Sequence, residues 1–472
     1  MDSKPSGAFL RAPAATLLAA LCFWFGTGLT PIWWCTWLAP LPLLWLATRA
    51  RASAVALAAF VAVLVGGLNQ WHYVHDLIKL PISVLLLQGG IASAVFALTV
   101  LLYRRLARRG QVLAAMFAVP LLWTVVFFAN AAGSPHGTWG DLAYTQMDAT
   151  LVIQIAAVTG IWGIGFTLML CAAWIATLAN DSAPRRARAT AAVVGAVLLA
   201  GALGYGAWRL GDDAAERSVT IGLVSQPGGK PLAPAEPAGE ALLGKYLAQL
   251  QPLVEAGAQY LVIPEVSFGV DHPDIPALRD FAQQRGVTLL TGVDLKMPNA
   301  PERNASLAFG PQGGAPSVYA KHHLVPVFED RFTPGSDTTL LPGGNVGLTI
   351  CKDNDFPALL RRYGEQNVQL MLIPAWDFQL DGWLHSRMAI LRGVESGFAI
   401  ARSARDGRLT LSDDRGRVLA EASSEEGPAH LIGELPLRHT HTLYARWGDW
   451  FAWVCVAGLV GTLGAAVWPR RG

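Results

Sequence analysis

Long apolar stretches occupy most of the first 210 residues and constrain the fold more than any other feature of this sequence. A helix needs about 20 mostly apolar residues to cross the hydrocarbon core of a membrane. Those 210 residues contain no Glu and few other charged side chains, whereas the rest of the chain has the charge density of an ordinary soluble domain. We therefore expect an α-helical membrane bundle of about eight spans joined to a soluble domain, with spans at roughly residues 13–29, 32–48, 52–69, 81–103, 111–130, 151–178, 188–207 and 447–468.

Basic residues in the short loops predict how these spans are oriented, because cytoplasmic loops carry an excess of Lys and Arg. With the N-terminus inside, the short outer loops contain only Lys79. We expect three parts: a seven-span membrane domain (1–210), an extracytoplasmic domain (211–446), and a C-terminal membrane helix with a cytoplasmic tail (447–472). The inner segments contain thirteen basic residues, namely Lys4, Arg11, Arg49, Arg51, Arg104, Arg105, Arg108, Arg109, Arg185, Arg186, Arg188, Arg470 and Arg471.

Short β-rich runs alternate with amphipathic helical segments between residues 215 and 440. Continuous apolar runs such as Leu-Val-Ile-Pro and Leu-Met-Leu-Ile-Pro indicate strands buried on both faces, as in a layered α/β domain. We expect helices at 238–257, 275–285, 356–366 and 383–396. We expect strands at 219–226, 260–265, 287–295, 304–310, 317–321, 346–351, 371–376, 398–403 and 409–413.

Three residues suited to catalysis fall at the ends of predicted strands: Glu265, Lys321 and Cys351. Side chains converge at such strand ends in an α/β sheet. Taken singly, a solvated Glu or Lys and a core Cys are the commoner interpretations. Together they supply covalent acyl transfer, which needs a thiol, a carboxylate that takes its proton, and an ammonium that stabilises the oxyanion. The backbone N–H of Lys352 is a candidate second oxyanion donor.

The order and spacing of Glu265, Lys321 and Cys351 match the Glu-Lys-Cys triad of the carbon–nitrogen hydrolase (nitrilase) superfamily. Eight membrane spans around such a domain further resemble the apolipoprotein N-acyltransferase family. The resemblance implies a nitrilase-like α-β-β-α sandwich for the soluble domain. Three further segments resemble those of the family: Trp139–Gln146, Asn304–Gly310 and Ser412–Val418.

The same resemblance implies a site and a two-step reaction. Cys351 would be the nucleophile, Glu265 the general base and acid, and Lys321 the oxyanion stabiliser. The thiol would take an acyl chain from a phospholipid, and the thioester would then acylate the N-terminal amine of a diacylglyceryl lipoprotein. The implied location is the bacterial inner membrane with the catalytic domain on the periplasmic side. No cofactor is implied, one chain contains every part of a monomeric enzyme, and the supporting residues would be Glu329, Lys352, Asp353 and Trp376.

Several segments depart from the acyltransferase pattern. Lys352 and Asp353 replace Tyr-Glu, and Val-Pro-Val-Phe-Glu replaces Val-Pro-Phe-Gly-Glu. Residues 373–378 replace Ser-Asn-Asp-Ala-Trp-Phe, and Arg-Ser-Ala-Arg-Asp-Gly at 402–407 replaces Arg-Ser-Ala-Asn-Thr-Gly. Three functions stay open: an N-acyltransferase, a membrane-tethered amidase or acyltransferase with another acceptor, and a non-catalytic homologue that binds lipids or lipoproteins. The presence of all three triad residues argues against the last.

Neither metal binding nor nucleic-acid binding is expected from the sequence. Zinc sites need three or four ligands at suitable spacing, and the soluble part does not offer histidines in such a pattern. The net charge of +2 gives no reason to expect a nucleic-acid partner. The histidines considered as metal ligands and set aside are His322, His323, His439 and His441.

Overall fold

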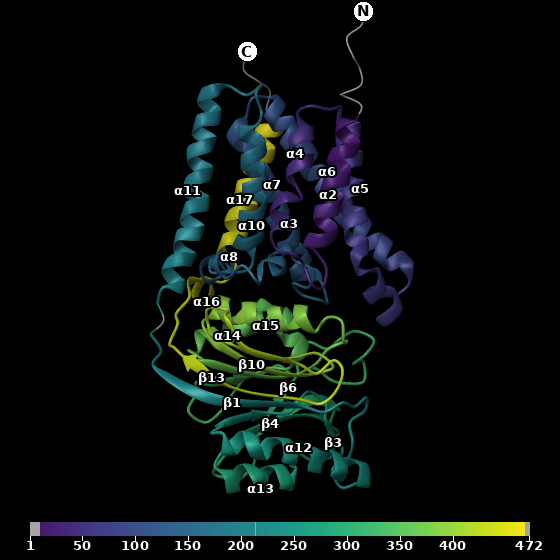
Figure 1. Ribbon diagram of the computed structural model, residues 1–472, viewed down its shortest axis with the longest axis vertical. Coiled ribbons are helices and arrows are strands. Elements are labelled where there is room, and N and C mark those ends of the chain that lie inside the picture. Colours follow the sequence, from purple (N-terminus) through teal and green to yellow (C-terminus); the bar gives the residue numbers. More distant parts are fainter. Residues whose placement is uncertain (1–9, 213, 468–472) are drawn as a thin grey trace, which may run out of the picture. The chain divides into compact units, whose positions relative to one another are not determined.

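The computed structural model describes residues 10–212 and 214–467, which form two compact units (Figure 1). The helical unit comprises residues 10–133, 140–210 and 449–467. The α/β unit comprises residues 134–139 and 211–448, so the short segment Ser134–Trp139 between two predicted spans belongs to it. Lys4, Arg470 and Arg471 of the predicted inner segments lie outside the described residues, as does Trp468 at the end of the last predicted span.

Five helices of the described chain are long and apolar enough to cross a membrane. Four shorter apolar helical stretches accompany them in the described chain, of which α2 (Arg11–Gly26) and α10 (Trp162–Leu178) are single helices. Apolar side chains on the outside of the helical unit suit contact with lipid, as on the last long helix before the α/β unit, where Val193 and Val197 are 63% and 64% exposed. The long helices are α5 (Ala52–Gly67) with the turn η1 (Leu68–Gln70), α6 (Ile82–Arg108), α7 (Val112–Gly133), α11 (Arg185–Leu210) and α17 (Trp450–Val467).

Two predicted spans are not single helices. The stretch at 32–48 forms α3 (Cys35–Leu38) and α4 (Leu41–Ala47), which separate at Pro40, a residue without the N–H that would continue the helix. The stretch at 151–178 forms α8 (Thr150–Ile153), α9 (Ala156–Thr159) and α10. Gly160 ends α9 with φ +67°, a conformation that glycine adopts without strain. The expectation of one uninterrupted helix was therefore wrong for both stretches.

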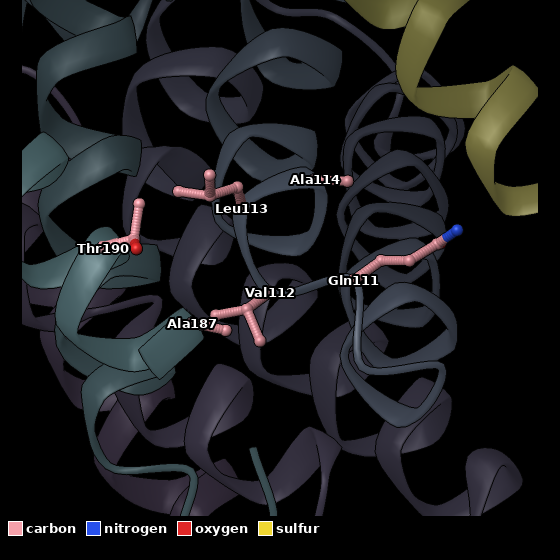
Figure 2. Close-up of a pocket in the computed structure, with 6 residues that line it drawn as sticks. All are labelled: Gln111, Val112, Leu113, Ala114, Ala187 and Thr190. Atoms are coloured by element: carbon pink, nitrogen blue, oxygen red, sulfur yellow. The ribbon is translucent and has the colours of Figure 1, made fainter. Parts of the chain in front are cut away.

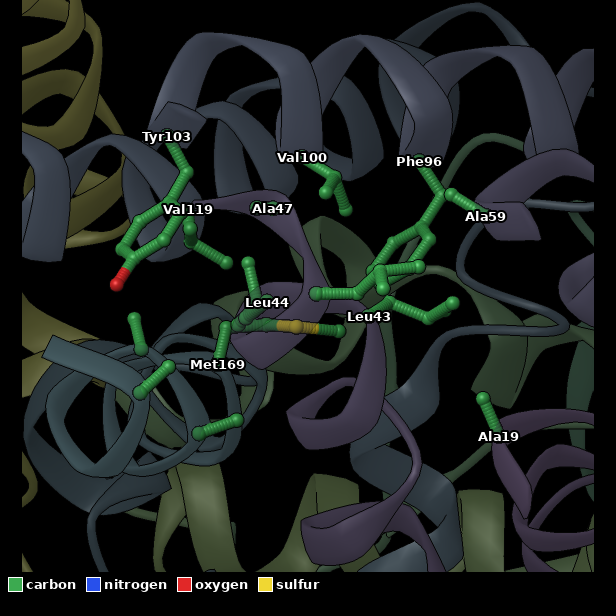
Figure 3. Packing of buried hydrophobic residues seen from close by; sticks show 14 of the residues in the cluster. Ala19, Leu43, Leu44, Ala47, Ala59, Phe96, Val100, Tyr103, Val119 and Met169 are labelled. Atoms are coloured by element: carbon green, nitrogen blue, oxygen red, sulfur yellow. The ribbon is translucent and has the colours of Figure 1, made fainter. Parts of the chain in front are cut away.

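Close helix packing fills the interior of the helical unit (Figure 3). At Gly66 on α5 a Cβ atom would lie 2.3 Å from the Cβ of Phe23 on α2, so only glycine allows the two helices to approach this closely. The Phe23 ring in turn meets the edge of the Phe96 ring on α6, with centroids 5.6 Å apart. The buried side chains labelled in Figure 3 include Leu43, Leu44, Val100, Tyr103 and Met169.

An open pocket in the helical unit lies where the start of α7 approaches the start of α11 (Figure 2). Gln111, Val112, Leu113 and Ala114 line one side, and Ala187 and Thr190 of α11 line the other. The lining side chains carry no charge and include none of the predicted catalytic residues. This pocket therefore has no part in the predicted chemistry.

The α/β unit is a sandwich of two sheets between two pairs of helices. The first sheet has the strand order β13-β1-β2-β4-β5-β6 with β3 beside β4, and the second has the order β12-β11-β10-β9-β8-β7. Helices α12 (Pro237–Glu255) and α13 (Pro276–Arg285) cover the outer face of the first sheet. Helices α14 (Pro357–Glu365) and α15 (Gly382–Ser396) cover the second. The predicted α-β-β-α sandwich is confirmed.

The strands of the two sheets vary in length from two residues in β7 to nine in β1 and β13. The first sheet contains β1 (Arg217–Ser225), β2 (Tyr260–Val262), β3 (Phe268–Val270), β4 (Thr288–Leu295), β5 (Arg303–Phe309), β6 (Ser317–Ala320) and β13 (Ala429–Leu437). The second sheet contains β7 (Thr339–Leu340), β8 (Val346–Leu348), β9 (Leu370–Trp376), β10 (Ala399–Arg405), β11 (Arg408–Ser412) and β12 (Val418–Ser423). The short helix α16 (Leu443–Trp447) ends the unit.

Apolar side chains of both sheets meet in one core. Ile221 and Leu290 from the first sheet pack in the same cluster as Leu348, Leu372 and Leu411 from the second, and all five are fully buried. The other faces of the two sheets are covered by helices, which explains why several central strands are continuous apolar runs.

The predicted helices of this unit agree with the structure to within two residues at each end. Four strands, β3, β7, β12 and β13, were missed; β12 and β13 are largely solvent-accessible and lack the apolar runs that mark the central strands. Three predicted strands end early, at Val262, Ala320 and Leu348. The candidate residues of the site therefore lie in the loops just beyond these strands.

Candidate active site

Two carboxylates hold the ammonium group of Lys321, which directly follows β6. Its Nζ atom lies 2.7 Å from Oε1 of Glu265 and 2.8 Å from Oε2 of Glu329. Lys321 is 1% exposed and Glu265 is 3% exposed, so this ion pair is removed from solvent. The structure therefore brings together two of the three predicted triad residues, with Glu329 as a second carboxylate partner.

Glu265 lies between the two sheets of the sandwich. Its backbone N–H donates to the carbonyl of Ala375 on β9, 3.3 Å away, although Glu265 itself follows β2 of the other sheet. Gly292 on β4 allows this placement, because a Cβ atom there would lie 2.4 Å from the Cα of Glu265. Local backbone packing thus fixes the carboxylate beside Lys321.

Asn304 on β5 joins the two carboxylates. Its side-chain amide donates to Oε1 of Glu265 at 2.6 Å and also to Oε1 of Glu329. The carboxylate of Glu329 also accepts the backbone N–H of Val325 at 2.6 Å, and this hydrogen bond stabilises the loop between the two residues. The sequence placed Asn304 only within a strand that resembles the family, and its role as a link between the carboxylates was missed.

Burial and charge act in opposite directions on these groups. Burial lowers the pKa of Lys321, but the charges of Glu265 and Glu329 outweigh it and raise the pKa well above the usual value. Burial raises the pKa of Glu265, and the charge of Lys321 offsets only part of that effect. Lys321 is therefore a permanent cation, and Glu265 takes up a proton more readily than an ordinary carboxylate does.

Cys351 begins the turn η4 (Cys351–Asp355), which follows β8 of the second sheet. Its backbone has φ +40°, a left-handed conformation that is strained for a residue with a side chain. The Sγ atom lies 3.5 Å from the carbonyl oxygen of Trp376. Burial and then the charge of Glu265 raise the pKa of Cys351 well above its usual value, while Lys321 lowers it in part. The thiol is protonated at neutral pH and lies within electrostatic reach of both partners.

Asp353 fastens the loop after Lys321 to the turn that carries Cys351. Its carboxylate accepts the hydroxyl of Tyr319 at 2.7 Å and the backbone N–H groups of His322 and His323 at 3.1 and 2.9 Å. It also accepts the N–H of Ile350, directly before the cysteine, at 3.1 Å. Asp353 is therefore a structural anchor between the two segments.

Lys352 points away from the ammonium cluster. Its Nζ lies 3.2 Å from Asp355 and 3.4 Å from Nδ1 of His136, and the residue is buried. The charge of Lys352 is thus matched by Asp355 in the same turn. The side chain of Lys352 is separate from the Lys321 cluster, and any share in oxyanion binding falls to its backbone N–H.

Trp376 ends β9 beside charged residues from the two segments, 373–378 and 402–407, in which the sequence departs from the family pattern. Its indole N–H donates to Asp406 at 3.0 Å, and the guanidinium of Arg405 stacks on its ring at 3.6 Å from the centroid. Arg402, on the same strand as Arg405, forks onto the carboxylate of Asp377. These contacts depend on strand pairing between β9 and β10, which motif spacing does not reveal.

One group of potential metal ligands occurs among the described residues: Asp377, Asp381 and His385, whose ligand atoms all lie within 4.8 Å of one another. The carboxylate of Asp377 is already engaged by both terminal nitrogens of Arg402. Burial lowers the pKa of His385, but the two carboxylates outweigh it and raise the value to about 10. The three residues form an ion-pair network together with Arg402.

Comparison with known proteins identifies the family. Models of the apolipoprotein N-acyltransferase N-terminal domain and of the carbon–nitrogen hydrolase match residues 17–174 and 230–443. An apolipoprotein N-acyltransferase of Allorhizobium ampelinum is 30% identical over 72% of this chain and 70% of its own length. The chain belongs to the apolipoprotein N-acyltransferase family. A second member, from Geobacter metallireducens, is 24% identical over 97% of this chain and 95% of its own.

An amidase from Nesterenkonia sp. is similar in structure, with 25% identity, a TM-score of 0.38, and coverage of 46% of this chain and 90% of its own. In the present chain, the segment that matches the carbon–nitrogen hydrolase model (230–443) includes the candidate residues Glu265, Lys321 and Cys351. The Trp139–Gln146 segment that resembles the family forms the turn η3 (Leu142–Gln146). There the buried Gln146 accepts the indole N–H of Trp37 at 2.7 Å.

Proposed function

We propose that this protein moves an acyl chain from a phospholipid, through a thioester on Cys351, to the N-terminal amine of a lipoprotein. Membership of the apolipoprotein N-acyltransferase family supports the lipoprotein acceptor. The observation that carries the proposed mechanism is the buried Lys321 ammonium held between Glu265 and Glu329, within electrostatic reach of the thiol. Such a cluster suits acyl transfer because it offers a proton acceptor and a fixed positive charge at one place.

In the first step the sulfur of Cys351 attacks the ester carbonyl of the phospholipid. Because the thiol is protonated at rest, its proton passes to Glu265 as the carbon–sulfur bond forms. The negative charge then develops on the carbonyl oxygen, where the Lys321 ammonium stabilises it; one such donor is worth about 3 kcal/mol. The carbon–oxygen bond breaks, Glu265 returns the proton to the leaving alkoxide, and a lysophospholipid departs.

In the second step the amine of the acceptor attacks the thioester carbonyl. Glu265, ionised again, removes a proton from the attacking nitrogen as the carbon–nitrogen bond forms. The carbon–sulfur bond breaks and the proton returns to Cys351, which restores the starting thiol. Glu329 and Asn304 keep the carboxylate and the ammonium in place through both steps.

The arrangement in the membrane is part of the proposal. We place the chain in the bacterial inner membrane as a monomer with eight crossings and the α/β unit on the periplasmic side. The excess of basic residues in the inner loops supports this orientation. In a variant without native cysteines, an impermeant maleimide added to spheroplasts is expected to label Glu426→Cys and not Asp181→Cys. The reverse pattern would refute the orientation.

The decisive experiment follows the acyl chain itself. The purified full chain is incubated with a phospholipid that carries a labelled acyl group, and hydroxylamine-sensitive label on the protein is measured. We expect a labelled thioester that Cys351→Ala lacks. A lipopeptide with a free N-terminal amine is expected to discharge the thioester, whereas the same lipopeptide with its amine acetylated is not.

Other outcomes identify the alternative functions. A thioester that decays at the same rate with the free and the acetylated lipopeptide would indicate hydrolysis, as in a membrane-tethered amidase. An adduct discharged only by a different amine would indicate an acyltransferase with another acceptor. No adduct from any donor would contradict the proposed mechanism and favour a binding protein without catalysis.

A further inference from the structure

Arg405 contacts two residues of the candidate active site, Glu265 and Trp376. It ends β10, opposite Trp376 in the strand pairing, and its guanidinium stacks on that indole ring at 3.6 Å from the centroid. One terminal nitrogen donates to the backbone carbonyl of Glu265 at 3.4 Å. The carbonyl of Trp376 in turn accepts the thiol of Cys351. The guanidinium thus borders the backbone of the proposed base and the residue that contacts the nucleophile.

Among the described residues, no carboxylate forms a direct ion pair with the guanidinium of Arg405. The residue is 2% exposed, yet across residues 10–212 and 214–467 no carboxylate oxygen lies within 4.0 Å of its nitrogens. Its buried Nε atom has no hydrogen-bond partner. Asp406, the next residue, accepts the indole N–H of Trp376 instead. A buried cation without a partner is costly, so an anion that enters the site would relieve that cost.

Arg402 shows what a purely structural arginine looks like at this place in the fold. It lies three residues earlier on the same strand and is equally buried, but both of its terminal nitrogens bind the carboxylate of Asp377. Burial lowers the pKa of Arg405, and the charges of Tyr246, Asp406 and Glu265 offset only part of that effect, because none of them forms an ion pair of this kind. Arginine nevertheless stays protonated in proteins, so Arg405 offers a positive charge without a direct ion pair and an N–H group that has no acceptor.

We propose that Arg405 forms an oxyanion subsite beside Cys351 that binds the phosphate of the phospholipid acyl donor. A planar guanidinium binds phosphate or carboxylate oxygens through paired hydrogen bonds. This inference rests on the proposed function, because a phospholipid carries its phosphate on the same glycerol that bears the ester to be cleaved. A carboxylate of the lipopeptide acceptor has the same chemistry, and the experiment separates the two sources.

The first test does not need turnover, so it stays informative if acyl transfer itself fails. Iodoacetamide alkylation of Cys351 in the full chain is followed by mass spectrometry of its peptide, with sn-glycerol 3-phosphate or glycerol added. We expect glycerol 3-phosphate to slow alkylation and glycerol not to. Arg405→Gln, which keeps an N–H for the Glu265 carbonyl, is expected to lose this protection. Unchanged protection in Arg405→Gln would overturn the subsite.

The matched control for this test is Arg408→Gln. Arg408 starts the next strand, and its guanidinium pairs with Glu421 and Glu425 rather than with the site. Like Arg405→Gln, the substitution Arg408→Gln removes one positive charge from the second sheet. We expect Arg408→Gln to keep the full protection by glycerol 3-phosphate, and equal loss of protection in both variants would overturn the assignment to Arg405.

The second test identifies the source of the anion. Thioester formation is compared for labelled phosphatidylglycerol and for the matching diacylglycerol, which lacks the phosphate. We expect Arg405→Gln to slow the reaction of the phospholipid by about tenfold to a hundredfold, the range for hydrogen bonds to a charged group, and to leave the diacylglycerol rate unchanged. An equal fall in the rate of thioester formation with both donors would show that Arg405 only positions Glu265. Slower discharge to the lipopeptide alone would assign the subsite to the acceptor, and either result would overturn the proposal.

Discussion

The side-chain amide of Asn304 donates a hydrogen bond to the carboxylate of Glu265 at 2.6 Å, in the interior of the α/β unit. The same nitrogen also binds Glu329. Two carboxylates that share one ammonium repel each other, and an amide donor between them reduces that repulsion. Asn304 therefore sets how readily Glu265 holds its charge, which is the property that a general base depends on.

We expect Asn304→Ala to shift the pH dependence of thioester formation. Loss of the hydrogen bond to the ionised form raises the pKa of Glu265 further, so the base becomes available only at higher pH. The acid limb of the rate profile should move upward by about one pH unit, the size of one hydrogen bond to a charged group. Asn345→Ala, which removes an amide that binds only Gln369, is the control. Identical profiles for the two variants would contradict this role.

The two lysines near the nucleophile should differ sharply in their contribution. Lys321→Met removes the cation that separates Glu265 from Glu329 and the proposed oxyanion stabiliser, so thioester formation should fall by about a hundredfold or more. Lys352→Met leaves that cluster intact, because the Lys352 side chain pairs with Asp355. Its rate should fall much less than that of Lys321→Met, although the loss of the buried partner of Asp355 should lower the melting temperature. A larger effect at Lys352 than at Lys321 would show that the oxyanion role belongs to the other lysine.

The three candidate triad residues stand out in the sequence because each follows an apolar strand and their order matches a known pattern. Glu265 and Lys321 indeed meet, although both lie beyond strands that end earlier than expected. The link through Asn304 could not be predicted, because it depends on which strands pair. Neither could the contact of Thr138 with Asp355, since 217 positions separate them and Thr138 lies between two apolar stretches.

In the helical unit, the strong hydropathy of a whole stretch concealed the residues at which the helix is interrupted. Hydropathy alone predicts one helix across 151–178, because nearly every residue there is apolar. Gly160 interrupts that helix with φ +67°, and Pro40, which lacks a backbone N–H, separates α3 from α4. Both residues are visible in the sequence. Their effect depends on whether the surrounding protein satisfies the freed backbone groups, which the sequence does not state.

Glu265→Gln should change two rates in opposite directions: alkylation of Cys351 by iodoacetamide should become faster, and thioester formation should be lost. Burial and then Glu265 raise the pKa of the thiol, so the iodoacetamide rate should still be rising at pH 9, where an ordinary thiol approaches its plateau. Glu265→Gln removes the negative charge and should speed alkylation at pH 8, while thioester formation from phospholipid is lost. Both rates are measured on the same preparation. Slower alkylation in Glu265→Gln would show that Glu265 activates the resting thiol instead.

His385 should make the stability of the α/β unit depend on alkaline pH. Asp381 and Asp377 raise the pKa of His385 to about 10, from 6.5 in the unfolded chain. The folded state thus keeps a proton that the unfolded state loses, so this stabilisation is complete below pH 6.5 and disappears as pH rises through 10. The slope is about 1.4 kcal/mol per pH unit in between. Melting temperatures between pH 7 and 10 should fall less steeply in His385→Gln. His272→Gln, at an exposed position, should match the wild type.

Gly137 presses against the end of the turn that begins with Cys351. Its φ is +54°, and a Cβ atom there would lie 2.4 Å from the carbonyl oxygen of Asp355. Thr138 donates to that same oxygen through its N–H at 3.0 Å and its hydroxyl at 2.8 Å. The segment Ser134–Trp139 therefore holds the turn at Asp355, its last residue. Any residue larger than glycine must displace one of the two segments.

We expect Gly137→Ala to lower thioester formation by about tenfold or more, because small displacements of a nucleophile are costly to the rate. The matched control is Gly133→Ala at the end of α7, where a Cβ atom meets open space and φ is not positive. Thioester formation and melting temperature are measured for both variants. A loss of rate in Gly137→Ala without a matching loss of melting temperature places the effect on the position of Cys351. Equal rates in the two variants would show that the turn keeps its geometry without this contact.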